Sequence, residues 1–300
     1  MFKKNILKTY INPHILLTFA ALFWGFNAIA GRSAVGEVSP LLIVTSRWLG
    51  VLIILSIICR KDIMNSFKDF KKNFAWFLSM GLLGFTGFNS LYYISAHYTV
   101  AINLGIVQST MPAFIIIISM IWLKTKVNSL QVLGLFITFI GVLIVISNGE
   151  IQSLLDFTIN NGDLIMIFAC IFYALYAVGL KKRPNVSDLI LMTFFSYIAF
   201  IGSLPGLVVE IWFDKIVFPT EKGLIILLII IIFPSFLAQI CFMKGVKTLG
   251  PSISGLYTNL VPVFTSILAV LILDEKFYFY HFVSLLVVFF GIYVFEKKRS

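Results

Sequence analysis

The sequence contains an internal duplication, and each copy is too apolar for a water-soluble fold. Residues 101–144 read AINLGIVQSTMPAFIIIISMIWLKTKVNSLQVLGLFITFIGVLI, and the matching segment, 150 positions later, reads PSISGLYTNLVPVFTSILAVLILDEKFYFYHFVSLLVVFFGIYV. Pro112 falls on Pro262 and Gly141 on Gly291 at one offset, with no gap. Each copy contains two runs of about twenty nearly uncharged residues, the length of a helix that crosses a bilayer. The duplication therefore predicts a repeated unit that spans a membrane.

Ten apolar runs can be marked along the chain, and they leave no room for a soluble domain. They cover residues 14–31, 40–59, 74–96, 99–122, 129–147, 163–180, 188–209, 223–243, 252–273 and 279–295. With 60% apolar residues, 12% charged residues and a mean hydropathy of +1.01, the chain cannot present a charged surface to water on all sides. We predict an all-α polytopic membrane protein whose partner is the lipid bilayer. It has ten transmembrane helices in two five-helix repeats, residues 1–148 and 149–300.

The net charge of +10 is explained by membrane topology. With the N-terminus inside, Arg32, Lys215, Lys222 and Lys276 fall on the outer side and Arg47 lies within a span, which leaves eighteen of the 23 Lys and Arg residues inside. Cytoplasmic loops are enriched in these residues. We therefore predict a protein of the cytoplasmic (inner) membrane with both termini in the cytoplasm. Since no basic stripe interleaved with aromatic residues exists outside the runs, we expect no nucleic-acid partner.

Five spans in each repeat make the second repeat enter the membrane from the opposite side to the first. Inverted repeats give a fold two nearly equivalent conformations, one open to each side, which is the basis of alternating access. Pro112 and Pro262 lie deep in equivalent spans, where each proline leaves a carbonyl without its hydrogen bond. Two interruptions at corresponding places in the two halves point to a transporter's binding site, and we expect both prolines to act as hinges.

Polar and aromatic side chains gather near mid-depth in spans 1, 4, 6 and 9, and they favour a pocket for a small-molecule solute. Trp24 and Asn27 match Tyr173 and Tyr176, each pair one helical turn apart, and further polar residues lie just before the two prolines. The predicted solute-binding residues are Trp24, Asn27, Gln108, Tyr173, Tyr176, Tyr257 and Asn259. Asn89 and Gln239 add polar lining from spans 3 and 8. Hydrogen bonds between helices and stabilisation of the two kinks are the alternative roles.

Arg47 is the one full charge well inside a run, about 10 Å below the outer end of its helix. An unpaired charge at this depth is costly, so the side chain is expected to face the bundle or water. Two roles are open: contact with an anionic group of the solute, or structural pairing with helix-end carbonyls or Glu37. We favour the structural role.

The start of the chain resembles a secretory signal, because Lys3, Lys4 and Lys8 precede an apolar run that ends in Ala28-Ile29-Ala30. The run is nevertheless copied inside the chain, since LFWGFNAI (22–29) matches IFYALYAV (171–178). We therefore expect the first helix to be retained.

The chain resembles the drug/metabolite transporter superfamily and, within it, the EamA-type transporters. The resemblance rests on FWGFNAIAGR (23–32), on SPLLIVTSRW (39–48), on the two helix-proline-helix copies, and on the acidic turn at Asp274 and Glu275. It spans essentially the whole chain and implies a secondary transporter of amino acids or related metabolites, with export favoured over import. The first repeat departs from the family's pattern, because Lys124-Thr125 stands where an acidic pair or a glutamate is common.

Other functions make different demands on the sequence. An importer of a nucleotide-, vitamin- or nucleoside-like metabolite would have the same fold. A membrane-embedded enzyme would need His, Asp or Glu clustered at one interface, whereas the acidic residues here are scattered. We expect no enzyme activity, cofactor or metal, since Cys59, Cys170 and Cys241 lack metal-ligand spacing and no nucleotide-binding Walker A motif is present. Monomer and homodimer both remain open.

Overall fold

The computed structural model describes residues 12–96, 98–99, 101–150, 152–156, 159–272 and 276–297. All regular secondary structure in these residues is helical, and ten of their helices are long and apolar enough to cross a membrane. The predicted all-α, ten-span architecture is thus confirmed, with span boundaries within a few residues of the expected ones. The largest difference is in span 8, which runs on to Leu249 and stops at Gly250, where φ is +88°. The residues Lys3, Lys4, Lys8, Asp274 and Glu275 lie outside the described part of the chain.

The helices of the first repeat are α1 (Pro13–Ser33), α2 (Pro40–Ile58), α3 (Arg60–Lys72), α4 (Phe74–Gly81), α5 (Phe88–Ala96), α6 (Ala101–Gln108), α7 (Met111–Leu123) and α8 (Ser129–Ile146). A short helix, α9 (Gln152–Leu155), follows. Those of the second repeat are α10 (Asn161–Gly179), α11 (Asp188–Trp212), α12 (Glu221–Ile230), α13 (Ala238–Leu249), α14 (Pro251–Leu256), α15 (Leu260–Ile272) and α16 (Phe279–Glu296).

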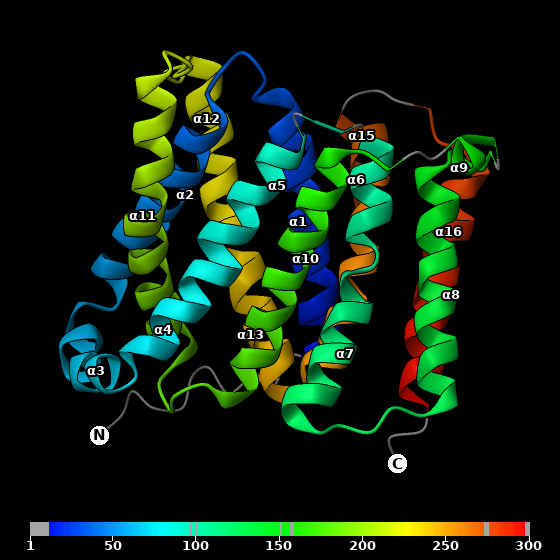
Figure 1. Ribbon diagram of the computed structural model, residues 1–300, viewed down its shortest axis with the longest axis horizontal. Helices are drawn as coiled ribbons and strands as arrows, with labels where there is room; N and C mark the ends of the chain where they lie inside the picture. The colour runs from blue at the N-terminus through cyan, green and yellow to red at the C-terminus, as the bar shows by residue number, and fades with distance from the viewer. Residues whose placement is uncertain are drawn as a thin grey trace.

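The packing of the two repeats is related by an inverted two-fold pseudosymmetry. Spans 2 and 5 pack on their own counterparts, α2 on α11 and α8 on α16. Helix α1 packs on α13 and α15, as its counterpart α10 packs on α5 and α7. Helix α1 begins on the side of the bundle where α16 ends, whereas α10 begins on the opposite side (Figure 1). We call the side with the start of α1 and the end of α16 the terminal face and the other side the distal face.

Side chains satisfy the first backbone N–H groups of several spans, which lipid cannot do. Asn128 forms a capping box with Gln131 at the start of α8, and Asn160 forms one with Asp163 at the start of α10. The start of α2 is capped from another span: the Glu210 carboxylate of α11 accepts from the N–H groups of Leu41 and Leu42 at 3.1 and 3.0 Å and from the Ser39 hydroxyl at 2.7 Å.

Four spans are irregular near mid-depth, in two equivalent pairs. Spans 3 and 8 each contain a π-helical segment, η1 (Leu82–Gly87) between α4 and α5 and η3 (Ile231–Leu237) between α12 and α13. Span 4 breaks between α6 and α7, just before Pro112. Span 9 passes through a 3₁₀ turn, η4 (Tyr257–Asn259), just before α15 and Pro262. π-Helical segments and broken spans are frequent at functional sites. They leave some backbone N–H and C=O groups without a partner inside the helix, so these groups can bind other side chains or a ligand.

The connection between spans 2 and 3 is itself a helix, α3, which lies on the terminal face (Figure 1). Its Phe70 is buried against Phe77 and Phe194, with ring centroids 5.3 and 4.4 Å away. The charged residues of α3 are exposed. This arrangement is typical of an amphipathic helix at the membrane surface.

Candidate functional site

A cavity of about 560 Å³ lies between the two repeats. Its walls come from both halves: α1, α2, α5, α6, α7 and α8 from the first, and α10, α13, η4 and α15 from the second. Residues directly after the irregular segments border it, namely Phe88 and Asn89 after η1, Gln239 after η3, and Met111 after the break in span 4. The interruptions therefore converge on one central space.

The cavity opens toward the distal face. Its lining includes Ile29 near the end of α1, Ile146 at the end of α8 and Ala269 near the end of α15. These helices end on the distal face (Figure 1). Asn148, just beyond α8, also borders the cavity and is exposed.

A dry layer of side chains separates the cavity from the terminal face. Leu17, Tyr176, Phe242 and Val246 are all inaccessible to solvent. Helix α1 and helix α13 are in close contact in this layer, because a Cβ at Gly245 would lie 2.3 Å from the Leu17 side chain. The structure is thus open on one side and sealed on the other, which is what one state of an alternating-access carrier requires.

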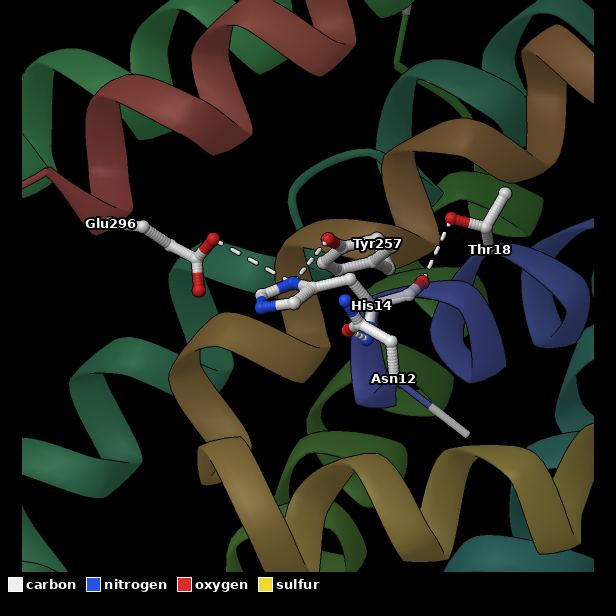
Figure 2. A network of polar contacts seen from close by, with 5 residues as sticks. All are labelled: Asn12, His14, Thr18, Tyr257 and Glu296. Atoms are coloured by element: carbon white, nitrogen blue, oxygen red, sulfur yellow. Dashed lines mark hydrogen bonds and ion pairs between the residues drawn. The ribbon is translucent and has the colours of Figure 1, made fainter. Parts of the chain in front are cut away.

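A polar network on the terminal-face side of this layer joins the start of α1, the 3₁₀ turn η4 and the end of α16 (Figure 2). His14 Nδ1, at the start of α1, lies 2.7 Å from the hydroxyl of Tyr257 in η4 and 3.6 Å from Oε2 of Glu296 at the end of α16. The side chain of Asn12 accepts a hydrogen bond from the His14 backbone N–H at 2.9 Å. The network ties α1 to the broken span 9 and to span 10 on the sealed side.

Four of the seven predicted binding residues line the cavity: Trp24, Asn27, Gln108 and Tyr173. The Trp24 and Tyr173 rings meet edge to face at 5.9 Å, and both contact Phe242 of the sealed layer at 5.3 and 5.5 Å. The half-buried Gln108 side chain makes no hydrogen bond to the described residues. The cavity thus has an aromatic base with amide groups beside it.

The other three predicted residues do not line the cavity. Tyr176 is packed under Tyr173 in the sealed layer, Tyr257 bonds to His14, and the Asn259 amide donates to Thr138 Oγ1 of α8 at 3.0 Å. The repeat predicts the direction of these side chains only in part: Gln108 and its equivalent Thr258 both line the cavity, whereas Asn27 lines it and its equivalent Tyr176 does not. Asn259 corresponds to Ser109, one position after Gln108, and neither of these two residues lines the cavity.

Side-chain hydroxyl groups donate hydrogen bonds to backbone carbonyls beside both broken segments. Ser109 Oγ donates to the carbonyl of Ile106 at 2.6 Å, and Thr258 Oγ1 donates to that of Gly255 at 2.7 Å. This is the kink stabilisation named above as the alternative role for polar residues before the prolines. Pro262 itself borders the cavity, whereas Pro112 is buried. Their action as hinges stays a prediction.

Arg47 lies two turns into α2, buried at 2% exposure, and borders the cavity. Its Nε donates to Ser235 Oγ and its Nη1 to Asn89 Oδ1, both at 2.8 Å. It does not pair with Glu37, which accepts from Thr220 and bonds to Lys222 at 3.4 Å instead. The Thr220 hydroxyl is the main cause of a lowered pKa at Glu37.

Sequence reasoning did not single out two contributors to this site, Ser235 and Phe88. Ser235 follows Pro234 inside an apolar run, so a polar residue beside a proline was the available signal. Phe88 carries no such signal, because one apolar residue within an apolar span has no distinguishing mark. Its position is set by the extra residue that η1 adds to the helical turn.

Ten spans, two inverted repeats and a central cavity open to one side define a multi-pass membrane protein of the transporter class. Comparison with known proteins agrees: the model of the EamA-like transporter family matches residues 12–147 and again residues 160–296. The chain therefore belongs to the EamA-like transporter family.

Two similar proteins are also described as transporters. "Uncharacterized transporter YyaM" of Bacillus subtilis (strain 168) is 29% identical over 265 residues, which is 87% of this chain and 86% of that protein. "Uncharacterized transporter YetK" of the same organism is 26% identical over 300 residues, 98% and 90% of the two chains. A solved structure described as "Crystal structure of protein" has a TM-score of 0.75 at 16% identity and covers 95% of this chain and 96% of its own. That last likeness shows the fold alone.

Proposed function

We propose that this transporter is a secondary carrier that moves a small organic metabolite, such as an amino acid, out of the cell by alternating access. The observation that supports it most is the central cavity between the inverted repeats, open to the distal face and sealed toward the terminal face. Because the repeats are inverted, exchanging their conformations would seal the distal side and open the terminal side. The solute would bind between Trp24, Asn27, Gln108 and Tyr173.

Two amide residues beside the broken segments of spans 4 and 9 allow a matched test of this site. Gln108→Ala removes an amide from the cavity, and Asn259→Ala removes one that faces α8 instead. Cells that express the wild-type chain are expected to accumulate one or a few metabolites in the medium, measured by mass spectrometry. Loss of one hydrogen bond to the solute should lower this export about tenfold for Gln108→Ala.

The control should behave differently. Asn259→Ala is expected to lower thermal stability by about 1 kcal/mol, with export per folded protein unchanged. Equal export by the Gln108→Ala variant and the wild type would remove Gln108 from the site. Accumulation of metabolites inside the cell rather than in the medium would favour the importer.

We also propose that the protein lies in the cytoplasmic membrane with the terminal face in the cytoplasm. The bias of Lys and Arg toward that face supports this orientation. Epitope tags on the two ends of the chain are then both expected to resist external protease in intact spheroplasts and to be cleaved after permeabilisation. Cleavage of either tag in intact spheroplasts would contradict the proposed topology.

A further inference from the structure

The buried guanidinium of Arg47 has more hydrogen-bond donors than the protein uses. An arginine carries five N–H groups, of which Nε–H and one on Nη1 are bonded to Ser235 and Asn89. Its other N–H groups make no hydrogen bond to the described residues. The Tyr93 hydroxyl is a polar neighbour that interacts with the guanidinium, but it has no hydrogen-bond partner at normal distance and angle. The side chain is 2% exposed and borders the cavity, so the spare donors are close to the solute space.

Both partners of Arg47 are neutral and are themselves fixed by the π-helical segments. Ser235 lies in η3, and its hydroxyl donates to the carbonyl of Ile230, the last residue of α12, at 2.6 Å; the Asn89 amide donates to the carbonyl of Phe85 in η1. Their oxygens are therefore turned toward the guanidinium. Irregular segments from both repeats thus hold one arginine in place, and neither supplies a negative charge to it.

No carboxylate of the described residues lies within ion-pair distance of Arg47. It is also the one charged residue among the described residues that line the cavity. A buried cation is normally paired, because an uncompensated charge in a low-dielectric interior is strongly unfavourable. At the cavity wall, Arg47 therefore has both N–H donors without a partner and a positive charge without a carboxylate beside it.

We propose that Arg47 is the anion-binding subsite of this cavity and that the transported solute is a small monocarboxylate. The inference rests on the proposed carrier function and names the solute's chemical class. A planar guanidinium with free N–H groups matches the geometry of a carboxylate. The rings of Trp24, Phe88 and Tyr173 line the same cavity and suit an aromatic or apolar body. One positive charge balances one negative charge, so a phosphate dianion would remain half uncompensated.

The test compares small molecules that share one phenyl body and differ in charge, using the purified full chain in detergent. The probes are 3-phenylpropionate, L-phenylalanine, 3-phenylpropionamide, phenethylamine and phenyl phosphate, and binding is followed by thermal shift and by titration calorimetry. The two carboxylates are expected to bind at least about tenfold more tightly than the amide and the amine. Phenyl phosphate should bind no more tightly than 3-phenylpropionate.

Two variants separate the effect of the Arg47 charge from that of its hydrogen-bond partners. Arg47→Gln should abolish the preference for carboxylate over amide, a loss of about 10- to 100-fold in affinity for 3-phenylpropionate. Ser235→Ala removes the partner of Nε but keeps the charge, so it should retain the preference. If Arg47→Gln does not fold, Arg47→Lys keeps the charge without the planar fork and should retain a weakened preference.

Several results would overturn the subsite. They are equal binding of carboxylate and amide by the wild type, no binding of any probe, tighter binding of phenyl phosphate, or an unchanged preference in Arg47→Gln. Failure here is distinguishable from failure of the carrier function. If the wild type exports metabolites but the exported compounds and the bound probes are not carboxylates, the carrier stands and the subsite falls.

Discussion

Replacing Gly134 with alanine is expected to lower the stability of the protein by about 1–3 kcal/mol, toward the upper end of that range. Gly134 lies where α8 and α16 are in backbone contact: an added Cβ would be 2.6 Å from the amide nitrogen of Phe295 and 2.7 Å from the carbonyl oxygen of Gly291. Backbone atoms cannot rotate away as a side-chain tip can. The two helices must therefore separate, which loosens the contact between spans 5 and 10.

The measurement is the melting temperature of the detergent-solubilised protein, followed by fluorescence-detected size exclusion, with an expected fall of about 5 °C. Gly206→Ala is the matched control, because its Cβ would meet Leu41 at 3.4 Å, an ordinary contact with a side chain, within α11. Since alanine favours helix, this control should be unchanged or slightly more stable. Equal melting temperatures for the two variants would refute the close contact of α8 with α16.

Replacing Glu210 with alanine is expected to lower stability by about 3 kcal/mol or more, since it leaves buried donors without an acceptor. The carboxylate, 7% exposed, accepts from one hydroxyl and two backbone N–H groups at the start of α2. Its negative charge also lies at the positive end of the helix dipole. Because α2 carries Arg47 two turns further on, the variant should also weaken binding at the cavity.

Two further variants give this prediction its control. Glu210→Gln keeps one oxygen acceptor but no charge, so the stability of this variant should lie between that of the wild type and that of Glu210→Ala. Asp156 carries an exposed carboxylate on the distal face, which accepts a hydrogen bond from the Gln152 side chain at 3.2 Å. Asp156→Ala removes this carboxylate and should change the melting temperature little. If Glu210→Ala melts at the same temperature as Asp156→Ala, the cap does not stabilise α2.

The candidate site was partly readable from the sequence. Trp24, Asn27, Gln108 and Tyr173 were found because they are polar or aromatic at mid-depth in spans of the repeat, and they line the cavity. Tyr176, Tyr257 and Asn259 have the same sequence features but face other helices. Depth in a span depends on residue number alone, whereas direction depends on rotation about the helix axis, which packing and the 3₁₀ and π-helical segments set.

The sequence by itself determined the ten spans, their inversion and the positions of the broken helices. Each of these follows from local properties: lipid requires about twenty apolar residues per helix, and proline lacks the N–H group that a helix uses. Only the tertiary structure decided that Glu210 caps α2 and that Arg47 meets Asn89 and Ser235 rather than Glu37. These contacts join residues from 42 to 188 positions apart, so they exist only once the spans have packed against one another.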